Sequence, residues 1–456
     1  MTRLDHIVVL MLENCSFDRI LGFSRAPSST FAGLSGSESN PVDPSAPAIA
    51  PHIAASRLPF ADYTGYVTAP DPHHELSDVT FQVFAGGPPG LGVANGQGFV
   101  ASYRELAPDK GPNVMGCFTR GQLRAITALA DEFVVFDHWH ASVPGPTWPN
   151  RFFAHCATSG GLSDSPSDAA AAGAQIVNTF PMPTVFEALE GAGGTWNVYY
   201  HDVPQSLALA RLHSRRDHFK YRSAFFQAAQ DGTLPSYSFI EPAYFNVPTL
   251  GVYANDMHPP HDLRYGDRLV ADVYNALRAG PKWESTALLV LWDEHGGFFD
   301  HVPPPDLATE SIACAPDTPS ETARAFQFNR LGVRVPAILA SAWAPKGGVV
   351  NDVFEHSAIP ATVRKVFGLN GVLSKRDALS RTFETALSLA APRSTPAVIP
   401  FTSPVGQPLE TQLANVSGTQ RQLLALANGL DVRGLATDGM GTVAGSVMRV
   451  ARYLDV

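Results

Sequence analysis

The architecture of this chain can be inferred from ten residues, Trp292-Asp293-Glu294-His295-Gly296-Gly297-Phe298-Phe299-Asp300-His301. They follow residues 286–291, an apolar run with the length and the leucine and β-branched content of a fully buried strand. Acidic residues directly after such a strand, and then two glycines, predict that the chain leaves a parallel sheet at its carboxyl edge. Ligand sites of open α/β sheets lie at this edge.

The adjacent carboxyl groups of Asp293 and Glu294 favour a metal site. In an apolar setting two carboxylates repel each other, so that they need either a proton or a shared cation. A solvated turn from strand to loop would also explain the pair. The glycines that follow, and then Asp300 and His301, favour the metal site over the turn.

Apolar runs of strand length alternate with helical segments along most of the chain. Strands are predicted at 6–11, 133–136, 196–200, 236–240, 286–291 and 335–341, and helices at 119–130, 184–190, 223–229, 265–279 and 357–367. This alternation predicts an α/β fold, a three-layer α/β/α sandwich with a mostly parallel sheet. Polar residues follow several of these strands, and in such a sheet those strand ends share one edge.

Two polar residues, Glu13 and Asn14, follow the first predicted strand. A carboxylate and an amide at the tip of a buried strand can coordinate a hard cation through oxygen. Ser16 is expected to cap the next helical turn. A capping turn without any metal would explain the same residues.

A rigid elbow around one hydroxyl group is predicted at Pro144-Gly145-Pro146-Thr147-Trp148-Pro149-Asn150-Arg151. Prolines restrict the backbone and hold the hydroxyl of Thr147 in place. Such a hydroxyl is suited to act as a nucleophile whose alkoxide is stabilised by a metal, with Asn150 and Arg151 as candidates for substrate binding. A threonine that merely caps a helix is the alternative.

Composition describes a large globular chain with an acidic surface. Apolar residues make up 45% of the 456 positions, and 42 acidic against 32 basic residues give a net charge of −10. No run rich in lysine or arginine occurs, which argues against a nucleic-acid partner. The four cysteines are far apart and form no C-x-x-C pattern, so no disulfide framework or cysteine metal site is expected.

The sequence contains no apolar run of 18 residues, so no transmembrane segment is expected. The chain begins almost directly with a strand and without a basic, then apolar leader. As written it is expected to be cytoplasmic, and secreted or periplasmic if a leader has been removed.

Changes in composition divide the chain into a main part and a C-terminal attachment. Residues 1–390 are predicted to form the catalytic domain, with irregular lid or rim insertions within 24–118. Residues 391–456 are predicted to form a Pro-rich strap and short helices near 409–429 and 443–454 that dock onto this domain.

Four blocks of the sequence resemble the signature blocks of the bacterial acid phosphatase and phospholipase C phosphoesterase family. They are Glu13-Asn14-Cys15-Ser16-Phe17-Asp18, Gly145-Pro146-Thr147-Trp148-Pro149-Asn150-Arg151, His258-Pro259-Pro260 and Asp293-Glu294-His295-Gly296-Gly297-Phe298-Phe299-Asp300-His301-Val302. The blocks occur in the family's order, and the resemblance spans residues 4–370. It implies an alkaline-phosphatase-like core.

The resemblance also implies a cofactor, one divalent cation, for which calcium, magnesium, manganese and zinc are candidates. Its ligands would be Glu13, Asn14, Thr147, Asp293 and Glu294. Thr147 would serve as the nucleophile as well as a ligand. One residue departs from the pattern: Cys15 stands where arginine is usual, which affects local packing more than chemistry.

Several histidines are assigned by the same resemblance. His74 and His258 would bind the phosphoryl oxygens, with His258 as the first choice for the general acid. His301 would also face the site, whereas His201 matches a phosphate-contacting histidine more loosely. His356 resembles a histidine at a helix entry and is expected to be structural.

Together these assignments predict a metal-dependent phosphoric ester hydrolase that acts through a covalent phosphothreonine. The block His295-Gly296-Gly297 is closer to the phosphatase branch than the Asn-Asp-Gly of many phospholipases. An acid-phosphatase-like phosphomonoesterase with a small phosphate-ester substrate is therefore favoured. The alternative within enzymes is a phospholipase C that cleaves phospholipid, and the alternative outside them is an inactive, metal-stabilised binding scaffold. The oligomeric state is left open.

Overall fold

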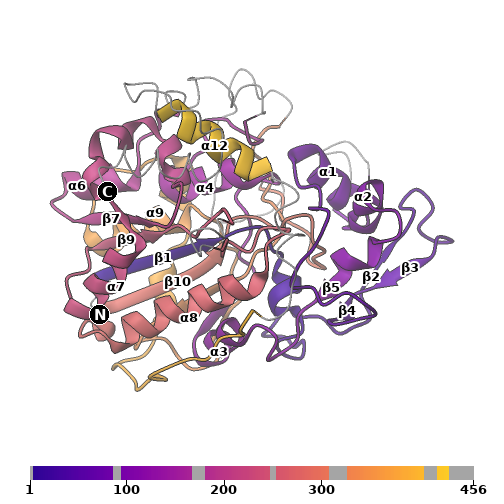
Figure 1. The fold of residues 1–456 in the computed structure, drawn as a ribbon, viewed down its shortest axis with the longest axis horizontal. Helices are drawn as coiled ribbons and strands as arrows, with labels where there is room; N and C mark the ends of the chain where they lie inside the picture. The colour runs from indigo at the N-terminus through magenta and orange to yellow at the C-terminus, as the bar shows by residue number, and fades with distance from the viewer. Residues whose placement is uncertain are drawn as a thin grey trace.

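A computed structural model describes residues 4–85, 94–166, 180–246, 253–307, 326–404 and 418–430. At its centre is an eight-stranded sheet in the order β12-β6-β11-β10-β1-β9-β7-β8. Figure 1 labels β1, β7, β9 and β10 of this sheet. The strands are β1 (His6–Leu12), β6 (Val134–Phe136), β7 (Trp196–Tyr200), β8 (Phe219–Tyr221), β9 (Tyr237–Ile240), β10 (Thr286–Trp292), β11 (Ala337–Ala340) and β12 (Val349–Val350). All six predicted strands are present, and β8 and β12 are additional.

Seven strands of this sheet run in the same direction and β11 runs in the opposite one. β11 pairs antiparallel with both β10 and β6, while the other five pairings in the sheet are parallel. The predicted mostly parallel sheet is therefore confirmed.

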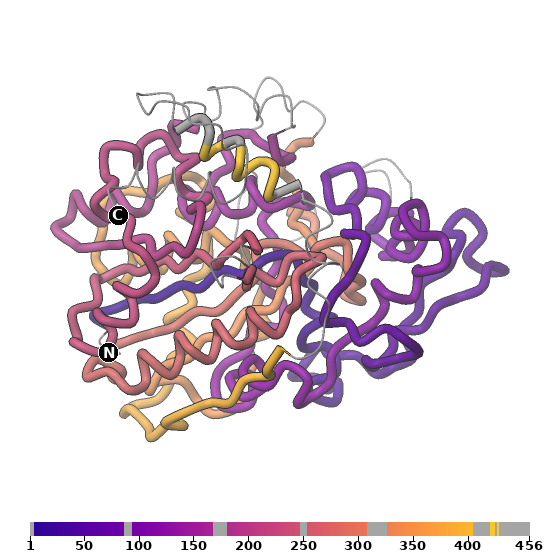
Figure 2. Tube along the Cα trace, in the orientation of Figure 1, coloured from indigo at the N-terminus to yellow at the C-terminus, as the bar shows by residue number. Residues whose placement is uncertain are grey.

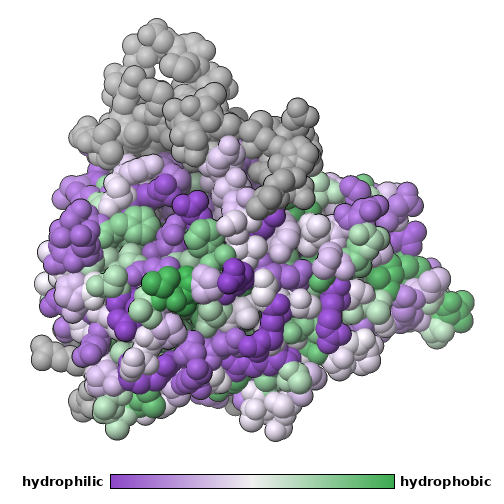
Figure 3. Space-filling view, turned by 60° about the horizontal axis from the view of Figure 1, so that its bottom comes forward, coloured by the Kyte–Doolittle hydropathy of each residue, from purple (hydrophilic) through white to green (hydrophobic). Residues whose placement is uncertain are grey.

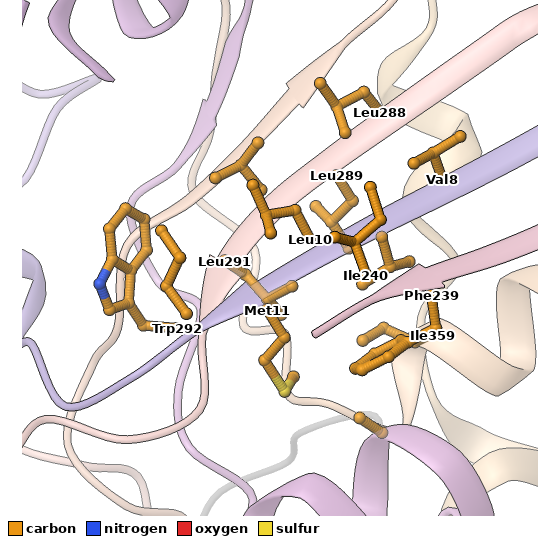
Figure 4. Close-up of a cluster of buried hydrophobic side chains, with 14 of the residues drawn as sticks. Val8, Leu10, Met11, Phe239, Ile240, Leu288, Leu289, Leu291, Trp292 and Ile359 are labelled. Carbon is orange, nitrogen blue, oxygen red and sulfur yellow. The ribbon is translucent and has the colours of Figure 1, made fainter. Parts of the chain in front are cut away.

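The two central strands, β1 and β10, are buried over their whole length. Helices cover both faces of such a sheet, so apolar side chains can occupy successive positions instead of alternating with polar ones. Figure 4 shows the resulting core, in which Leu10, Met11 and Leu291 belong to one cluster with Phe239 and Ile359.

Helices form a layer on each side of the sheet (Figure 1). α3 (Arg124–Glu132), α7 (Arg222–Asp231) and α8 (Leu263–Ala279) pack together in one layer, and α4 (Thr147–Cys156), α6 (Val185–Gly191) and α9 (Ala358–Phe367) in the other. Local signals fix the helix starts. Asp262 accepts a hydrogen bond from the N–H of Arg264 at the start of α8, and Thr184 forms a capping box with Glu187 at the start of α6. The predicted three-layer sandwich is confirmed.

The described parts of residues 24–118 form a lobe beside the sheet, drawn in indigo to purple in Figure 2. The lobe contains β2 (Ser39–Pro41), β3 (His52–Ala54), β4 (Ser56–Arg57), α1 (Leu76–Phe84), α2 (Phe99–Leu106) and β5 (Gly116–Cys117). Phe298 and Phe299 pack into its apolar cluster with Val83 and Phe99. The segment after β10 therefore joins the lobe to the sheet, and its two phenylalanines belong to a core.

Described parts of the predicted C-terminal attachment lie against the main part of the chain. Near residue 399 the chain runs along α8 (Figure 2). The side chain of Asn275 donates to the carbonyl of Ile399 and accepts from its N–H. α12 (Gly418–Leu430) buries Leu423 and Leu426 in the central core cluster. The division into domains stays a prediction, and the predicted helix at 443–454 lies outside the described residues.

The remaining elements are short. They are α10 (Lys375–Leu379), the π-helical turn η1 (Asp18–Gly22), and the 3₁₀ segments η2 (Gly111–Met115), η4 (Gln205–Ala208), η5 (Ala210–His218), η7 (Trp283–Ser285) and η8 (Phe383–Ala386). The hydroxyl of Ser16, predicted to cap a helical turn, accepts a hydrogen bond from the N–H of Arg19. Among the described residues, no helix has the length and apolar character needed to cross a membrane.

Candidate active site

Glu13 and Asp293 leave the sheet side by side. In the parallel pair of β1 and β10, Leu12 lies opposite Trp292, and the N–H of Asp293 donates to the carbonyl of Leu12 over 3.1 Å. Each acidic residue is the first after its strand, so both carboxylates reach the carboxyl edge of the sheet. The strand pattern predicts this juxtaposition.

Arg151 lies between the two carboxylates and is completely buried. Its Nε is 3.1 Å from Asp293 Oδ2, and its Nη2 is 3.2 Å from Glu13 Oε1. The same Nη2 donates to the carbonyl of Met11. Arg151 therefore balances and orients the acidic side chains, and its predicted contact with substrate stays a prediction.

The carboxylates outnumber this arginine. Glu13, Asp293 and Glu294 are all completely buried. Burial raises the pKa of Glu13 well above its usual range and that of Asp293 to about 6, and the charge of Arg151 opposes both shifts. Among the described residues, both oxygens of Glu13 and Oε1 of Glu294 accept no hydrogen bond. Three buried carboxylates thus share the charge of one arginine, and this donor set fits a divalent cation.

Asn14 connects the end of β1 with the elbow. It has a left-handed φ of 55°, which asparagine tolerates better than most residues. Its backbone N–H donates to Asp293 Oδ1 over 3.2 Å, and its side-chain Oδ1 accepts from the hydroxyl of Thr147 over 3.5 Å. The predicted nucleophile thus lies at the carboxylate cluster, together with the predicted metal ligands.

The elbow before Thr147 is shaped by the side chain of Asn150. Its amide nitrogen donates to the carbonyls of Val143, Gly145 and Pro146, and its oxygen accepts from the N–H of Val143. Both ends of the amide are engaged in holding the elbow, and the predicted role of Asn150 in substrate binding stays a prediction. Thr147 becomes the first residue of α4, where the helix dipole favours negative charge.

Two predicted histidines, His74 and His258, face each other beside Asn14. Their ring centroids are 5.8 Å apart, and Asn14 Nδ2 lies 3.3 Å from His74 Nε2. The Nδ1–H of each ring donates to a backbone carbonyl, that of Pro72 for His74 and that of Pro259 for His258. Among the described residues, Nε2 of His258 makes no hydrogen bond, whereas Nε2 of His74 lies against Asn14.

The charge states of the two histidines differ. Burial lowers the pKa of His74, but the carboxylates of Glu294 and Asp71 outweigh this effect and raise it to about 9. Burial, and then the charge of His74, lowers the pKa of His258 well below its usual range. Burial also raises the pKa of Asp71 to about 7. His74 is therefore the protonated ring and His258 the neutral one.

Two glycines allow the site loops to meet. Gly296 and Gly297 have φ values of 63° and 72°. A Cβ atom on Gly296 would lie 2.3 Å from the carbonyl oxygen of Asn14, and one on Gly297 would lie 2.5 Å from that of His73. These close approaches explain why two glycines follow the acidic pair.

His201 and His301 have their described contacts elsewhere. His301 Nδ1 is 2.7 Å from Asp18 Oδ2, in a network that includes Asp300 and Arg334. His201 lines a cavity at the end of β7 with Arg222. Their predicted roles in substrate binding stay predictions.

Two further groups of side chains lie close enough to share a cation. Asp71, His74 and His258 form one group, and Asp18, Asp300 and His301 form the other. The second group is neutralised by ion pairs of 3.0 Å and 2.8 Å with Arg334. The first adjoins Asn14 and so extends the predicted site.

Several supporting residues could not be assigned from the sequence. Gln82 Oε1 is 2.8 Å from His295 Nε2, and nothing in the sequence around this glutamine indicates that contact. Asp256 bonds both the N–H of His258 and the ring of His261. The polar loop around Asp256 is visible in the sequence, but its partners are not.

This arrangement defines a class of protein, the α/β enzymes that gather carboxylates, a hydroxyl and histidines at the carboxyl edge of a mostly parallel sheet. The Phosphoesterase family matches residues 4–370, and the chain belongs to this family. The predicted resemblance is thereby confirmed, and the protein is a hydrolase of phosphoric ester bonds.

Similar proteins come from plants and bacteria. Non-specific phospholipase C1 of Arabidopsis thaliana is 39% identical over 392 residues, which cover 83% of this chain and 70% of that protein. Non-specific phospholipase C6 of the same plant is 37% identical, with coverages of 93% and 80%. Phospholipase C A of Mycobacterium tuberculosis is 28% identical, with coverages of 86% and 78%.

The chain has distant likenesses among solved structures. One of them is a protein of the alkaline phosphatase superfamily from Vibrio parahaemolyticus, with 12% identity and a TM-score of 0.34. The match covers 57% of this chain and 63% of that protein's chain. The assignment to the family does not depend on this likeness.

Proposed function

We propose that this protein is a phospholipase C that cleaves the bond between glycerol and phosphate in a phospholipid, with Thr147 as the nucleophile. The observation that carries the proposed chemistry is the hydroxyl of Thr147, which lies 3.5 Å from Asn14 Oδ1, beside three buried carboxylates that share one arginine. Support for a phospholipid comes from the plant relatives at 37–39% identity, which are named non-specific phospholipases C. The block His295-Gly296-Gly297 favoured an acid phosphatase over a phospholipase C. These relatives favour the phospholipase C instead.

The proposed cofactor is one divalent cation. Glu13, Asn14, Thr147, Asp293 and Glu294 would hold it. When bound, it would supply Lewis-acid stabilisation of charge on the phosphoryl oxygens and on the threonine alkoxide. These ligands all offer oxygen, which suits calcium, magnesium or manganese, and zinc is the remaining candidate.

We assign the proton transfers to the two facing histidines. His258 is neutral and its Nε2 accepts no hydrogen bond, so it can take the hydroxyl proton of Thr147 as the oxygen attacks phosphorus. The phosphorus–oxygen bond to diacylglycerol then breaks, and the leaving oxygen takes a proton from His74, whose ring faces that of His258. From the sequence, His258 was the first choice for the general acid. In this proposal His258 is the general base and His74 is the general acid.

A water molecule completes the cycle. It attacks the phosphothreonine, the bond between Thr147 and phosphorus breaks, and the headgroup leaves as a phosphomonoester. The water gives one proton to His74, and the threonine oxygen recovers its proton from His258, so both rings return to their starting charge states. The start of α4 favours the negative charge that develops at Thr147.

The test should use a monomeric lipid. The large apolar side chains that are exposed among the described residues are Ile49, Leu106, Val372, Leu379 and Val398. On the face in Figure 3, apolar side chains form separate groups rather than one broad patch. These groups indicate no particular surface for docking to a bilayer. A dissolved lipid is therefore the better substrate, because its rate of cleavage contains no contribution from binding to a bilayer.

We would compare kcat/KM for short-chain phosphatidylcholine, below its micellar concentration, with that for p-nitrophenyl phosphate in the same buffer. The expected result is a clear preference for the lipid, with diacylglycerol and phosphocholine as products by mass spectrometry. Thr147→Val is the negative control. A preference for the monoester would restore the phosphatase reading, and release of phosphatidic acid would exclude C-type cleavage.

A further inference from the structure

A cavity of about 240 Å³ lies at the end of β7. Six of its lining residues matter here: His201, Arg222, Tyr253, Tyr265, Arg268 and Asp272. None of the predicted metal ligands lines it, so it is distinct from the carboxylate cluster at the ends of β1 and β10.

The buried wall of this cavity carries an imidazole without a partner. His201 is 7% exposed, and neither of its ring nitrogens makes a hydrogen bond with any residue that the structure describes. Burial, and then the charge of Arg222, lowers its pKa to about 3, so the ring is neutral and presents one N–H donor. A buried donor without an acceptor is costly, and a bound ligand would remove that cost.

The rim of the cavity is positively charged although the chain as a whole is acidic. Arg222 begins α7 and makes no ion pair with the described residues, and Arg268 comes from α8. Asp272 offsets part of this charge, but its Oδ2 is 3.6 Å from Arg268 Nε in a largely exposed pair. Such pairs contribute little, so the guanidinium of Arg268 can serve another anion.

An aromatic wall completes the cavity. Tyr253 and Tyr265 are stacked, with ring centroids 5.0 Å apart and planes 11° from parallel. The wall sets the size of the space beside the charged groups. Two guanidinium groups and a neutral imidazole N–H around a small cavity are donors that match the oxygens of a phosphate group.

We propose that this cavity binds a phosphate group, either inorganic phosphate or the phosphate of a small headgroup monoester, independently of Thr147. The proposal rests on the cavity alone and does not require the proposed function. It gives the ring of His201 a hydrogen-bond partner that the described part of the chain does not provide.

Protection of arginines tests the proposal on the full chain. Phenylglyoxal modifies accessible guanidinium groups, and mass spectrometry of peptides gives the rate at each arginine. Saturating inorganic phosphate or phosphocholine, at constant ionic strength, should slow modification of Arg222 and Arg268 about tenfold at ten times Kd. Arg381, exposed in a pair with Asp352, is the internal control and should not change.

Variants separate this cavity from the carboxylate cluster. Arg222→Gln should weaken phosphate binding about tenfold or more, measured as protection of Arg268. His201→Leu should do the same if it keeps the melting temperature of the parent. Thr147→Val should retain full protection.

The outcomes are decisive in both directions. Stronger protection by phosphocholine would identify a headgroup monoester as the ligand, and equal protection would identify the phosphate group itself. Absence of protection by both compounds would overturn the proposal. Loss of protection in Thr147→Val would also overturn it, because the anion would then be bound at the carboxylate cluster.

Discussion

His356 donates a hydrogen bond of 2.6 Å from its Nε2 to the backbone carbonyl of Asp293. The indole N–H of Trp139 donates to the opposite ring nitrogen, Nδ1, over 3.2 Å, so the ring is neutral with its hydrogen on Nε2. Burial lowers the pKa of His356 to about 4, which agrees with a neutral ring. The ring of His356 thus fixes the backbone of a predicted metal ligand, which agrees with the structural role expected from the sequence.

We therefore expect His356→Phe to lower the free energy of unfolding by about 1–3 kcal/mol, because the Asp293 carbonyl would be buried without a donor. His356→Gln retains an N–H donor and should lose less. Chemical denaturation of both variants measures the difference. Equal losses would show that ring packing, rather than this hydrogen bond, accounts for the effect.

The second prediction concerns the nucleophile. Thr147→Val keeps the shape of the side chain but lacks the oxygen, and should reduce turnover by about 10⁴-fold or more. Thr147→Ser should keep a measurable part of the activity. Thr127→Val, on a half-buried position of α3, is the matched control and should behave like the parent. Hydrolysis at near the parent rate by Thr147→Val would exclude a covalent phosphothreonine.

The ends of the strands could be predicted from the sequence because parallel strands share one carboxyl edge. Glu13 and Asp293 are each the first residue after a continuous apolar run, and the register of β1 and β10 brings them together. The direction of β11 could not be predicted, since an apolar run looks the same in either direction. The same argument places His201 at this edge. It does not tell whether His201 lies at the carboxylate cluster or in the separate cavity at the end of β7.

The helices α1 and α2 of the lobe could not be predicted from the sequence either. α1 contains valine, threonine and phenylalanine, which lower helix propensity, and it lies in a region rich in proline and serine. Its stability comes from packing against Phe99 and Phe298, which are distant in sequence. The contact between Gln82 and His295 was hidden for the same reason: it depends on tertiary structure and leaves no local pattern.

The third prediction is metal binding by two distant segments. Asn14→Ala and Glu294→Ala should each lower metal affinity at least about tenfold, because coordination needs the ends of both β1 and β10. Elemental analysis after dialysis gives the metal content. Glu284→Ala, at an exposed position, is the control. Unchanged metal content in both site variants would remove the proposed cation from this cluster.

The fourth prediction is a pH-dependent contribution of His74 in chelator-treated protein. Its folded pKa of about 9 lies above the unfolded value, so its stabilising effect is complete below about pH 6.5 and is lost as the pH rises through 9. His74→Gln should therefore cost up to about 3 kcal/mol at pH 6 and much less at pH 10. Urea denaturation at several pH values measures this cost. His52→Gln, at an exposed position, is the control, and a cost for His74→Gln that does not change with pH would contradict the assignment.

The last prediction separates backbone strain from close contact at Gly296. Both Gly296 and Gly193 have positive φ values, 63° and 81°, so an alanine at either position pays about 1–2 kcal/mol for the left-handed backbone. A Cβ on Gly193 would meet no atom within 4 Å, whereas one on Gly296 would lie 2.3 Å from the carbonyl oxygen of Asn14.

Gly296→Ala must therefore displace the loop that carries Asn14, at a further cost of about 1–3 kcal/mol. We expect Gly193→Ala to be mildly destabilised with full activity, and Gly296→Ala to lose stability, bound metal and turnover together. Thermal melts, elemental analysis and the lipid assay on both variants make the comparison. If Gly296→Ala kept its metal and activity, the contact between the two loops would not be what holds Asn14 at the carboxylates.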